Sequence, residues 1–239
     1  MEIKQYPDIA TLSNGLAEFI VKDMEAVLAK NDRYTIALSG GSTPKALYQM
    51  LAANYAANIN WGKVHLFFGD ERYVPFEHDD SNARMVTECL VNHVPIPAQQ
   101  VHIIRTDVAP QQSAVEYQTL LHQYFDGKPH TFDLALLGMG DDGHTLSLFP
   151  GTPVVFEHQK WVSEVFVPAK DGYRITITSP VVNLAKTVVF LVAGVAKAHA
   201  LNKVLNGEYE PSLVPAQIIK PVSGNLYWFI DNEAAEKLP

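Results

Sequence analysis

Nearly continuous apolar runs of strand length alternate along most of the chain with longer segments of helical periodicity. The apolar runs lie at residues 34–40, 63–70, 101–104, 132–140, 187–194 and 226–231. The helical segments lie at residues 10–29, 43–57, 80–92, 111–125 and 195–206. Strands that are apolar along their whole length are typical of parallel sheets covered by helices. The alternation therefore predicts an α/β fold with a doubly wound, mainly parallel sheet and helices on both faces.

One region has a different pattern. "WVSEVFV" (161–167) and "YRITITS" (173–179) alternate with a period of two, which predicts a short antiparallel strand pair with one solvated face. No linker rich in Pro, Gly or Ser divides the chain, and no repeat is present. We therefore expect a single domain over residues 1–239.

Charge and cysteine content narrow the classes of function. The formal net charge is −8 without a basic block, which argues against nucleic acid as a partner. No segment approaches the roughly 18–20 apolar residues of a membrane span, and the first residues do not resemble a signal peptide. The only cysteine, Cys89, cannot form an internal disulfide and is expected to pack in the core. We expect a cytoplasmic protein, and the sequence leaves monomer and small homo-oligomer both open.

The segment "SGGSTP" (39–44) joins the first apolar run to a helix and is suited to a phosphate group. Gly40 and Gly41 permit a tight turn, Ser42 or Thr43 can cap the helix, and Pro44 fits its first turn. Unpaired N–H groups would then gather at the positive helix end. The candidate phosphate-binding residues are Ser39, Gly40, Gly41, Ser42 and Thr43. The local sequence alone supports an ordinary glycine turn as well as it supports a phosphate site.

Three strand ends should meet at one crevice, because ligands of open α/β sheets bind at the carboxyl ends of the strands. These ends are residues 39–41, 69–72 and 138–144. Asp70 stands nearest its strand end and is expected in the site, with Arg72 as a candidate for substrate binding. For Glu71 we favour a salt-bridged loop instead.

The segment "GMGDDGH" (138–144) fits the dinucleotide fingerprint G-x-G-x-x-G. Two aspartates beside a pyrophosphate would be repulsive, and no acidic strand end suited to a ribose follows about 20 residues on. The glycines are better explained as turns that point Asp142 and His144 into the crevice. There His144 would act as an acid–base group and Asp142 would orient its ring. The alternative is that His144 only caps the turn.

Two further chemistries are disfavoured. "EHDDSN" (77–82) and "DDGH" (141–144) offer acidic groups, but no two histidines have the spacing of metal ligands. Residues 77–80 are instead expected to form a solvated loop that leads into a helix cap. The chain also lacks the G-x-S-x-G turn of serine esterases. In a hydrolase of this kind, water would be the nucleophile.

Seven segments resemble the family of 6-phosphogluconolactonases and glucosamine-6-phosphate deaminases, and within it the lactonases. They are "SGGSTP" (39–44), "GDERYVP" (69–75) with "DSN" (80–82), "GMGDDGHTLSLFPGT" (138–152), "YRITIT" (173–178), "VAGVAKA" (192–198), "VPAQII" (214–219) and "YWFID" (227–231). The resemblance implies a Rossmann-like domain that binds a sugar phosphate. It also implies hydrolysis of 6-phosphogluconolactone to 6-phosphogluconate in the pentose phosphate pathway, without a metal or organic cofactor.

The resemblance also assigns residues that composition would leave as surface charges. Arg174 and Lys197 are expected to meet the phosphate together with the 39–43 loop. Phe149 stands where the deaminases resembling this chain carry a glutamate, which disfavours deaminase activity. Leu146 stands where lactonases more often have alanine. The alternatives are an aminosugar-phosphate deaminase or isomerase and a non-catalytic sugar-phosphate sensor.

Overall fold

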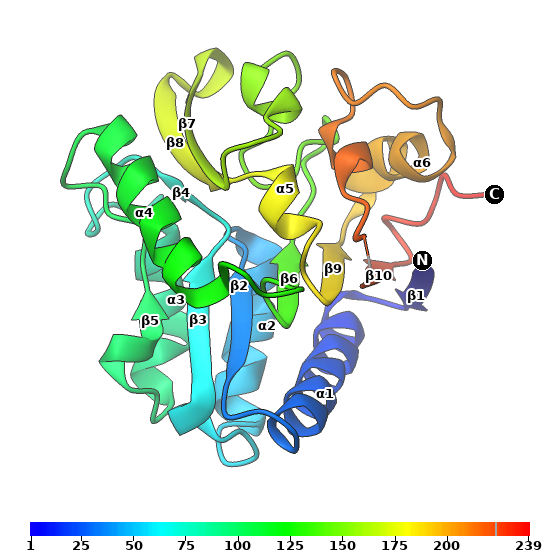
Figure 1. The fold of residues 1–239 in the computed structure, drawn as a ribbon. Coiled ribbons are helices and arrows are strands. Elements are labelled where there is room, and N and C mark those ends of the chain that lie inside the picture. The colour runs from blue at the N-terminus through cyan, green and yellow to red at the C-terminus, as the bar shows by residue number, and fades with distance from the viewer. Residues whose placement is uncertain (223) are drawn as a thin grey trace.

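A seven-stranded sheet forms the centre of the molecule in the computed structural model, which describes residues 1–222 and 224–239 (Figure 1). Its strand order is β1-β10-β9-β6-β2-β3-β5, and every neighbouring pair is parallel. The strands are β1 (Glu2–Tyr6), β2 (Tyr34–Leu38), β3 (Val64–Phe68), β5 (Val101–His102), β6 (Leu134–Leu137), β9 (Thr187–Val192) and β10 (Asn225–Asp231). All residues of β2, β6 and β9 are buried, as their apolar sequences predict.

Helices cover both faces of this sheet, with α2 behind it and α4 in front of it in Figure 1. The helices are α1 (Ile9–Leu28), α2 (Ser42–Asn54), α3 (Asn82–Cys89), α4 (Pro110–Phe125), α5 (Ser179–Val182) and α6 (Ala198–Asn206). The helices α1, α2 and α3 pack in succession along one side, and α4 packs on β7 (Val162–Val167) and β8 (Gly172–Ile177). The buried apolar side chains form one cluster, and Cys89 belongs to it. The predicted fold class and the packing role of Cys89 are confirmed.

The antiparallel region contains one strand more than the sequence predicts. A second sheet has the order β4-β8-β7, in which β4 (Asp70–Arg72) pairs with the expected pair β7 and β8. The prediction of a single strand over 63–70 is therefore wrong. The strand β3 ends at Phe68, and Gly69 carries the chain from one sheet to the other. The N–H of Gly69 donates to Leu38, while its carbonyl accepts from Ile177.

Strand β1 is the other strand that the pattern misses. Only two of its residues are even partly buried, because it lies at an edge of the sheet and β10 is its only partner there. An edge strand with little burial lacks the apolar signal that identifies the central strands. None of the described helices combines the length and apolar character needed to cross a membrane.

Candidate active site

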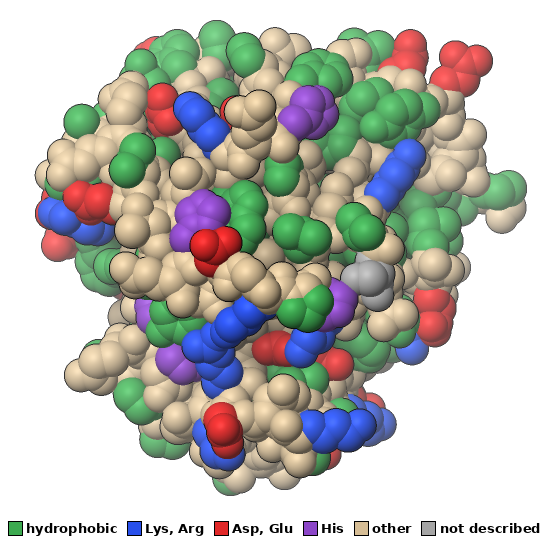
Figure 2. Space-filling model, in the orientation of Figure 1, with side chains coloured by type: hydrophobic (Ala, Val, Ile, Leu, Met, Phe, Trp, Pro, Cys, Tyr) green, Lys and Arg blue, Asp and Glu red, His purple; other side chains and the backbone are tan. Residues whose placement is uncertain are grey.

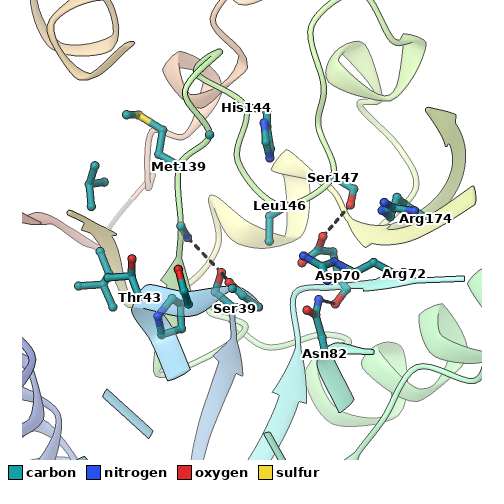
Figure 3. A pocket seen from close by; sticks show the side chains of 18 of the residues that line it. Ser39, Thr43, Asp70, Arg72, Asn82, Met139, His144, Leu146, Ser147 and Arg174 are labelled. Atoms are coloured by element: carbon teal, nitrogen blue, oxygen red, sulfur yellow. Dashed lines mark hydrogen bonds between the residues drawn. The ribbon is translucent and has the colours of Figure 1, made fainter. Parts of the chain in front are cut away.

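A cavity of about 290 Å³ opens beside the carboxyl ends of β2, β6 and β9 and the second sheet (Figure 3). This volume lies near the lower end of the roughly 300–1,000 Å³ typical of small-molecule sites. The predicted site residues on its wall are Ser39, Gly40, Gly41, Ser42, Thr43, Asp70, Arg72, His144, Arg174 and Lys197. Of the predicted set, only Asp142 does not line this cavity; its carboxylate is hydrogen-bonded to the His144 ring. The fold thus brings together segments more than a hundred residues apart.

The loop before α2 differs in detail from the sequence prediction. Gly41 is the N-cap with a φ of 106°, so neither Ser42 nor Thr43 caps the helix. These two residues are instead the first of the helix, where backbone N–H groups lack intrahelical partners. Their N–H groups and hydroxyls stand at the positive helix end beside the cavity.

Ser39 has a structural task in the same loop. Its hydroxyl accepts from the N–H of Gly138 at 3.1 Å, which joins the ends of β2 and β6. Gly40 lies so close to Asn82 that a Cβ at position 40 would be 1.9 Å from Asn82 Oδ1. The glycine is therefore needed for a close approach between the loop and α3.

His144 and Asp142 form a hydrogen-bonded pair. Asp142 Oδ1 lies 2.6 Å from His144 Nδ1 and also accepts the backbone N–H of His144 at 3.0 Å. Partial burial would raise the pKa of the Asp142 carboxyl, but the hydrogen bonds from His144 outweigh it and lower that pKa to about 2. An ionised carboxylate only accepts, so Nδ1 carries the hydrogen, and in the neutral imidazole the lone pair lies on Nε2. The ring is 24% exposed and points into the cavity (Figure 3).

The glycines of "GMGDDG" make room for this pair. A Cβ at Gly140 would lie 2.1 Å from His144 Nδ1 and 2.5 Å from Asp142 Oδ1. Gly143 has a φ of 80° and faces Val214, where a side chain would also collide. The imidazole of His144 also stacks on the ring of Phe149, with ring centroids 4.1 Å apart. These contacts hold the imidazole ring in place, and they explain the glycines of this segment without a bound nucleotide.

Asp70 and Ser147 form a second polar pair on the wall. Ser147 Oγ donates to Asp70 Oδ2 at 2.6 Å, and both side chains are buried (Figure 3). The Asn82 side chain donates to the carbonyl of Asp70 at 2.9 Å. Sequence reasoning missed Ser147 as a site residue and gave Asn82 no role, although "DSN" is part of the resemblance.

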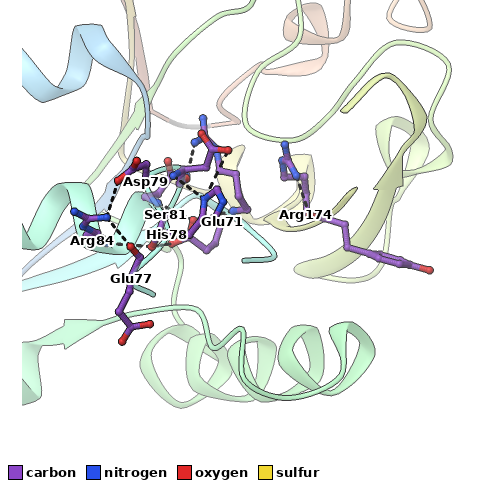
Figure 4. Close-up of polar contacts among 11 residues, drawn as sticks. Glu71, Glu77, His78, Asp79, Ser81, Arg84 and Arg174 are labelled. Atoms are coloured by element: carbon purple, nitrogen blue, oxygen red, sulfur yellow. Dashed lines mark hydrogen bonds and ion pairs between the residues drawn. The ribbon is translucent and has the colours of Figure 1, made fainter. Parts of the chain in front are cut away.

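The expectation of a salt-bridged Glu71 is wrong. Glu71 is 1% exposed, and among the described residues no basic side chain forms an ion pair with it. It accepts the backbone N–H groups of Arg72, Asn82 and Ala83 at 2.7–2.8 Å (Figure 4). The carboxylate therefore holds the start of α3. The expected solvated loop over residues 77–80 and the helix cap after it, Ser81, are confirmed.

Basic side chains dominate the charge of the cavity wall. Arg72, Lys170, Arg174 and Lys197 face one acidic residue, Asp70. Arg72 and Arg174 are opposite each other in the β4–β8 ladder. Burial, and after it the positive charge of Arg72, lowers the pKa of the Arg174 guanidinium. Two cations held together in this way favour an anionic ligand.

This local concentration of positive charge contrasts with the rest of the protein. On the face shown in Figure 2, basic and acidic side chains are interspersed, and the chain as a whole carries −8. Lys170 is a cavity cation that the sequence did not indicate. Among the residues that the structure describes, no three His, Cys, Asp or Glu side chains are grouped so that they could hold a metal ion.

Comparisons with known proteins agree on one group. A family profile described as glucosamine-6-phosphate isomerases/6-phosphogluconolactonase matches residues 7–228. A 6-phosphogluconolactonase of Synechocystis sp. is 44% identical over 216 residues, which cover 88% of this chain and 87% of that protein. One of Nostoc sp. is 39% identical over 241 residues, with 99% and 98% covered. The solved 6-phosphogluconolactonase of Trypanosoma brucei has a TM-score of 0.86 at 29% identity, with 100% and 98% covered.

Proposed function

The chain belongs to the family of glucosamine-6-phosphate isomerases and 6-phosphogluconolactonases, and on this premise we propose that it hydrolyses 6-phospho-D-glucono-1,5-lactone to 6-phospho-D-gluconate. The observation that carries the proposal is the His144–Asp142 pair, whose imidazole opens into a cavity lined by cations. An imidazole can activate water, and the cations suit a substrate with a phosphate group. The reaction belongs to the oxidative branch of the pentose phosphate pathway.

Water is the nucleophile in the proposed mechanism. His144 Nε2 takes a proton from water as the oxygen attacks C1 of the lactone, and it later returns that proton to the ring oxygen as the ester bond breaks. Asp142 keeps the hydrogen on Nδ1 and stabilises the imidazolium that forms between the two steps. The pKa of Asp142, lowered to about 2, keeps this carboxylate ionised throughout the neutral range.

The phosphate provides binding energy that orients the reacting carbon. Its proposed contacts are the N–H groups and hydroxyls of Ser42 and Thr43, together with Arg174 and Lys197. All four residues line the cavity. Arg72 lies beside Arg174 and adds to the positive field there. The buried Asp70–Ser147 pair lies on the same wall and offers groups that can bind sugar hydroxyls.

The rival activity within the family is deamination or isomerisation of an aminosugar phosphate. Phe149 speaks against it, because its ring stacks on the catalytic imidazole at a position where the related deaminases have a proton-transferring glutamate. A non-catalytic sensor would have no use for an oriented His144. Release of ammonia from glucosamine 6-phosphate would support the rival activity.

The direct test of the function is base titration of the acid released from freshly prepared 6-phosphogluconolactone. We expect the purified protein to release acid well above the spontaneous background. The rate should be the same with a chelator present, because the proposed mechanism uses no metal. A rate equal to the background would contradict the proposed function, and a rate lost to the chelator would contradict the mechanism.

Replacing Arg174 by alanine is expected to weaken binding of phosphorylated lactones in particular. Hydrogen bonds to a charged group contribute about 1.5–3 kcal/mol, so KM for 6-phosphogluconolactone should rise about 10- to 100-fold. The unphosphorylated glucono-lactone should be hydrolysed as by the parent protein. Lys160→Ala, which removes an exposed cation that does not line the cavity, is the matched control. Equal losses on both lactones would exclude Arg174 as a phosphate ligand.

The proposal extends to the organisation of the protein. Residues 1–239 would act as one sugar-phosphate-binding domain, which is supported by the single apolar cluster that joins both sheets. A cytoplasmic location is supported by the one cysteine, Cys89, which is free and buried.

A further inference from the structure

Glu71 lies next to the site without facing it. It is the middle residue of β4, between Asp70 and Arg72, which both line the cavity. Alternate residues of a strand point to opposite faces, so the Glu71 side chain points away from the substrate. Its carboxylate nevertheless accepts hydrogen bonds from three backbone N–H groups. Oε1 accepts the N–H groups of Arg72 and Asn82, both at 2.8 Å. Oε2 accepts that of Ala83 at 2.7 Å.

Two of these contacts reach the cavity wall. Asn82 is 3% exposed, its amide holds the carbonyl of Asp70, and it lies against the phosphate-binding loop at Gly40. Arg72 donates from Nη1 to the carbonyl of Asp80 at 2.7 Å. One buried carboxylate thus ties the strand that carries Arg72 to the helix that carries Asn82.

We propose that Glu71 is a positioning residue of the lactonase site, whose ionised carboxylate holds Arg72 and Asn82 in the geometry that binds the sugar phosphate. The inference rests on the proposed function and deepens it. Glu71 touches no substrate. It acts through the backbone N–H groups that it accepts, and a neutral carboxyl group would accept them less strongly.

Stability alone does not account for the charge at this position. Burial raises the pKa of Glu71 to about 7, although three backbone N–H groups oppose this shift. A carboxyl whose pKa is higher in the folded than in the unfolded protein favours folding while protonated. That contribution is lost as pH rises toward 7. Above pH 7 the ionised Glu71 therefore makes the fold less stable than the protonated form does. A role in ligand binding explains an ionised carboxylate at this position better than a role in stability.

The surroundings of Glu71 determine how its pH dependence can be isolated. The charges that act on Glu71 are those of Asp70, its neighbour on β4, and of Arg174 on β8. Arg84 of α3 points away from Glu71 and donates to the carbonyl of Glu77 and the carboxylate of Asp79 (Figure 4). Its Nε donates to the carboxylate of Glu88. The phosphate of the ligand also titrates, with a pKa of about 6. The ligand titrates in the same way with both proteins, so the ratio of the Kd of the variant to the Kd of the parent protein cancels this contribution.

The experiment is calorimetric titration of 6-phosphogluconate into the parent protein and Glu71→Gln from pH 5.5 to 8.5. At pH 8.5 we expect the Kd of Glu71→Gln to be about tenfold higher, which is within the range of about 5- to 150-fold typical of coupling between two sites. The ratio of the two Kd values should fall to about 1 at pH 5.5, where the parent Glu71 is protonated too. Glu88→Gln, on the exposed side of the same helix, should match the parent at every pH. A ratio that is constant with pH, or always 1, would overturn the proposal.

A second measurement uses only the parent protein, in case Glu71→Gln does not fold. Carbon-13 NMR of the Glu71 carboxyl should show its titration midpoint about one pH unit lower with saturating 6-phosphogluconate, since ionisation and binding favour each other reciprocally. A bound anion that acted through charge alone would raise the midpoint. An unchanged or raised midpoint therefore contradicts the proposal. A parent protein that binds as expected but fails to hydrolyse the lactone would contradict the proposed function instead.

Discussion

His144→Ala is expected to lower kcat for 6-phosphogluconolactone at least about 100-fold, the usual scale for a positioned acid–base group. The variant loses the cavity side chain that is proposed to accept the proton of the attacking water, at Nε2. The proposed phosphate-binding groups come from other segments, so Kd for 6-phosphogluconate should stay within about threefold of the parent value. Stopped-flow kinetics and calorimetry would measure the two quantities.

His158→Ala is the matched control, because His158 is exposed and does not line the cavity. Its kcat should equal that of the parent protein. If His144→Ala retains the parent kcat, His144 is not the base and the proposed mechanism fails. If kcat and product binding fall together, the imidazole contributes mainly to ligand binding.

Gly140→Ala should lower kcat almost as much, although the substitution adds only one methyl group outside the proposed catalytic pair, His144 and Asp142. The new Cβ would lie 2.1 Å from His144 Nδ1 and 2.5 Å from Asp142 Oδ1. The imidazole, the carboxylate or the backbone at residue 140 must therefore shift, and we expect this to disturb the hydrogen bond between His144 and Asp142. Misplacement of a reacting group by about 1 Å can cost about 100-fold in rate, and we expect a loss of kcat of that order.

Gly62→Ala provides the matched control, since its nearest neighbour would be 3.4 Å from the new Cβ. Both variants should keep the Tm of the parent protein within a few degrees. The crystal structure of Gly140→Ala should show the His144 ring displaced. Parent-like turnover by Gly140→Ala would mean that the observed ring position is not the reactive one.

The sequence identified the parts of the site that are local or lie at strand ends. Asp142 and His144 are two residues apart, so a turn rich in glycine is enough to bring them together. The loop 39–43 and Asp70 follow apolar strands, and parallel strands of one sheet place their carboxyl ends at the same edge. Arg174 and Lys197 were predicted as site residues only from the family resemblance, because nothing in the sequence around them distinguishes them from ordinary surface charges.

Glu71 and Ser147 show what sequence periodicity does not contain. Glu71 lies among charged residues that suggested a salt-bridged loop, and Ser147 lies in "TLSLF" (145–149), where nothing in the sequence indicated a site residue, yet both are buried. Glu71 meets the N–H groups of residues eleven and twelve positions later. Ser147 meets Asp70 across 77 positions. The third strand of the small sheet is the common cause, because pairing of β4 with β8 buries this region.

The amino-acid sequence by itself determined the alternation of strands and helices, the loops at the strand ends and the closeness of Asp142 to His144, since each depends on hydrophobic spacing or near neighbours. Only the tertiary structure decided which cations share the cavity, that Glu71 is buried and accepts backbone N–H groups, and that Gly140 lies against the His144 ring. Those features depend on contacts between segments far apart in the chain. The period of a pattern fixes how each segment is buried, whereas packing of the whole chain selects its neighbours.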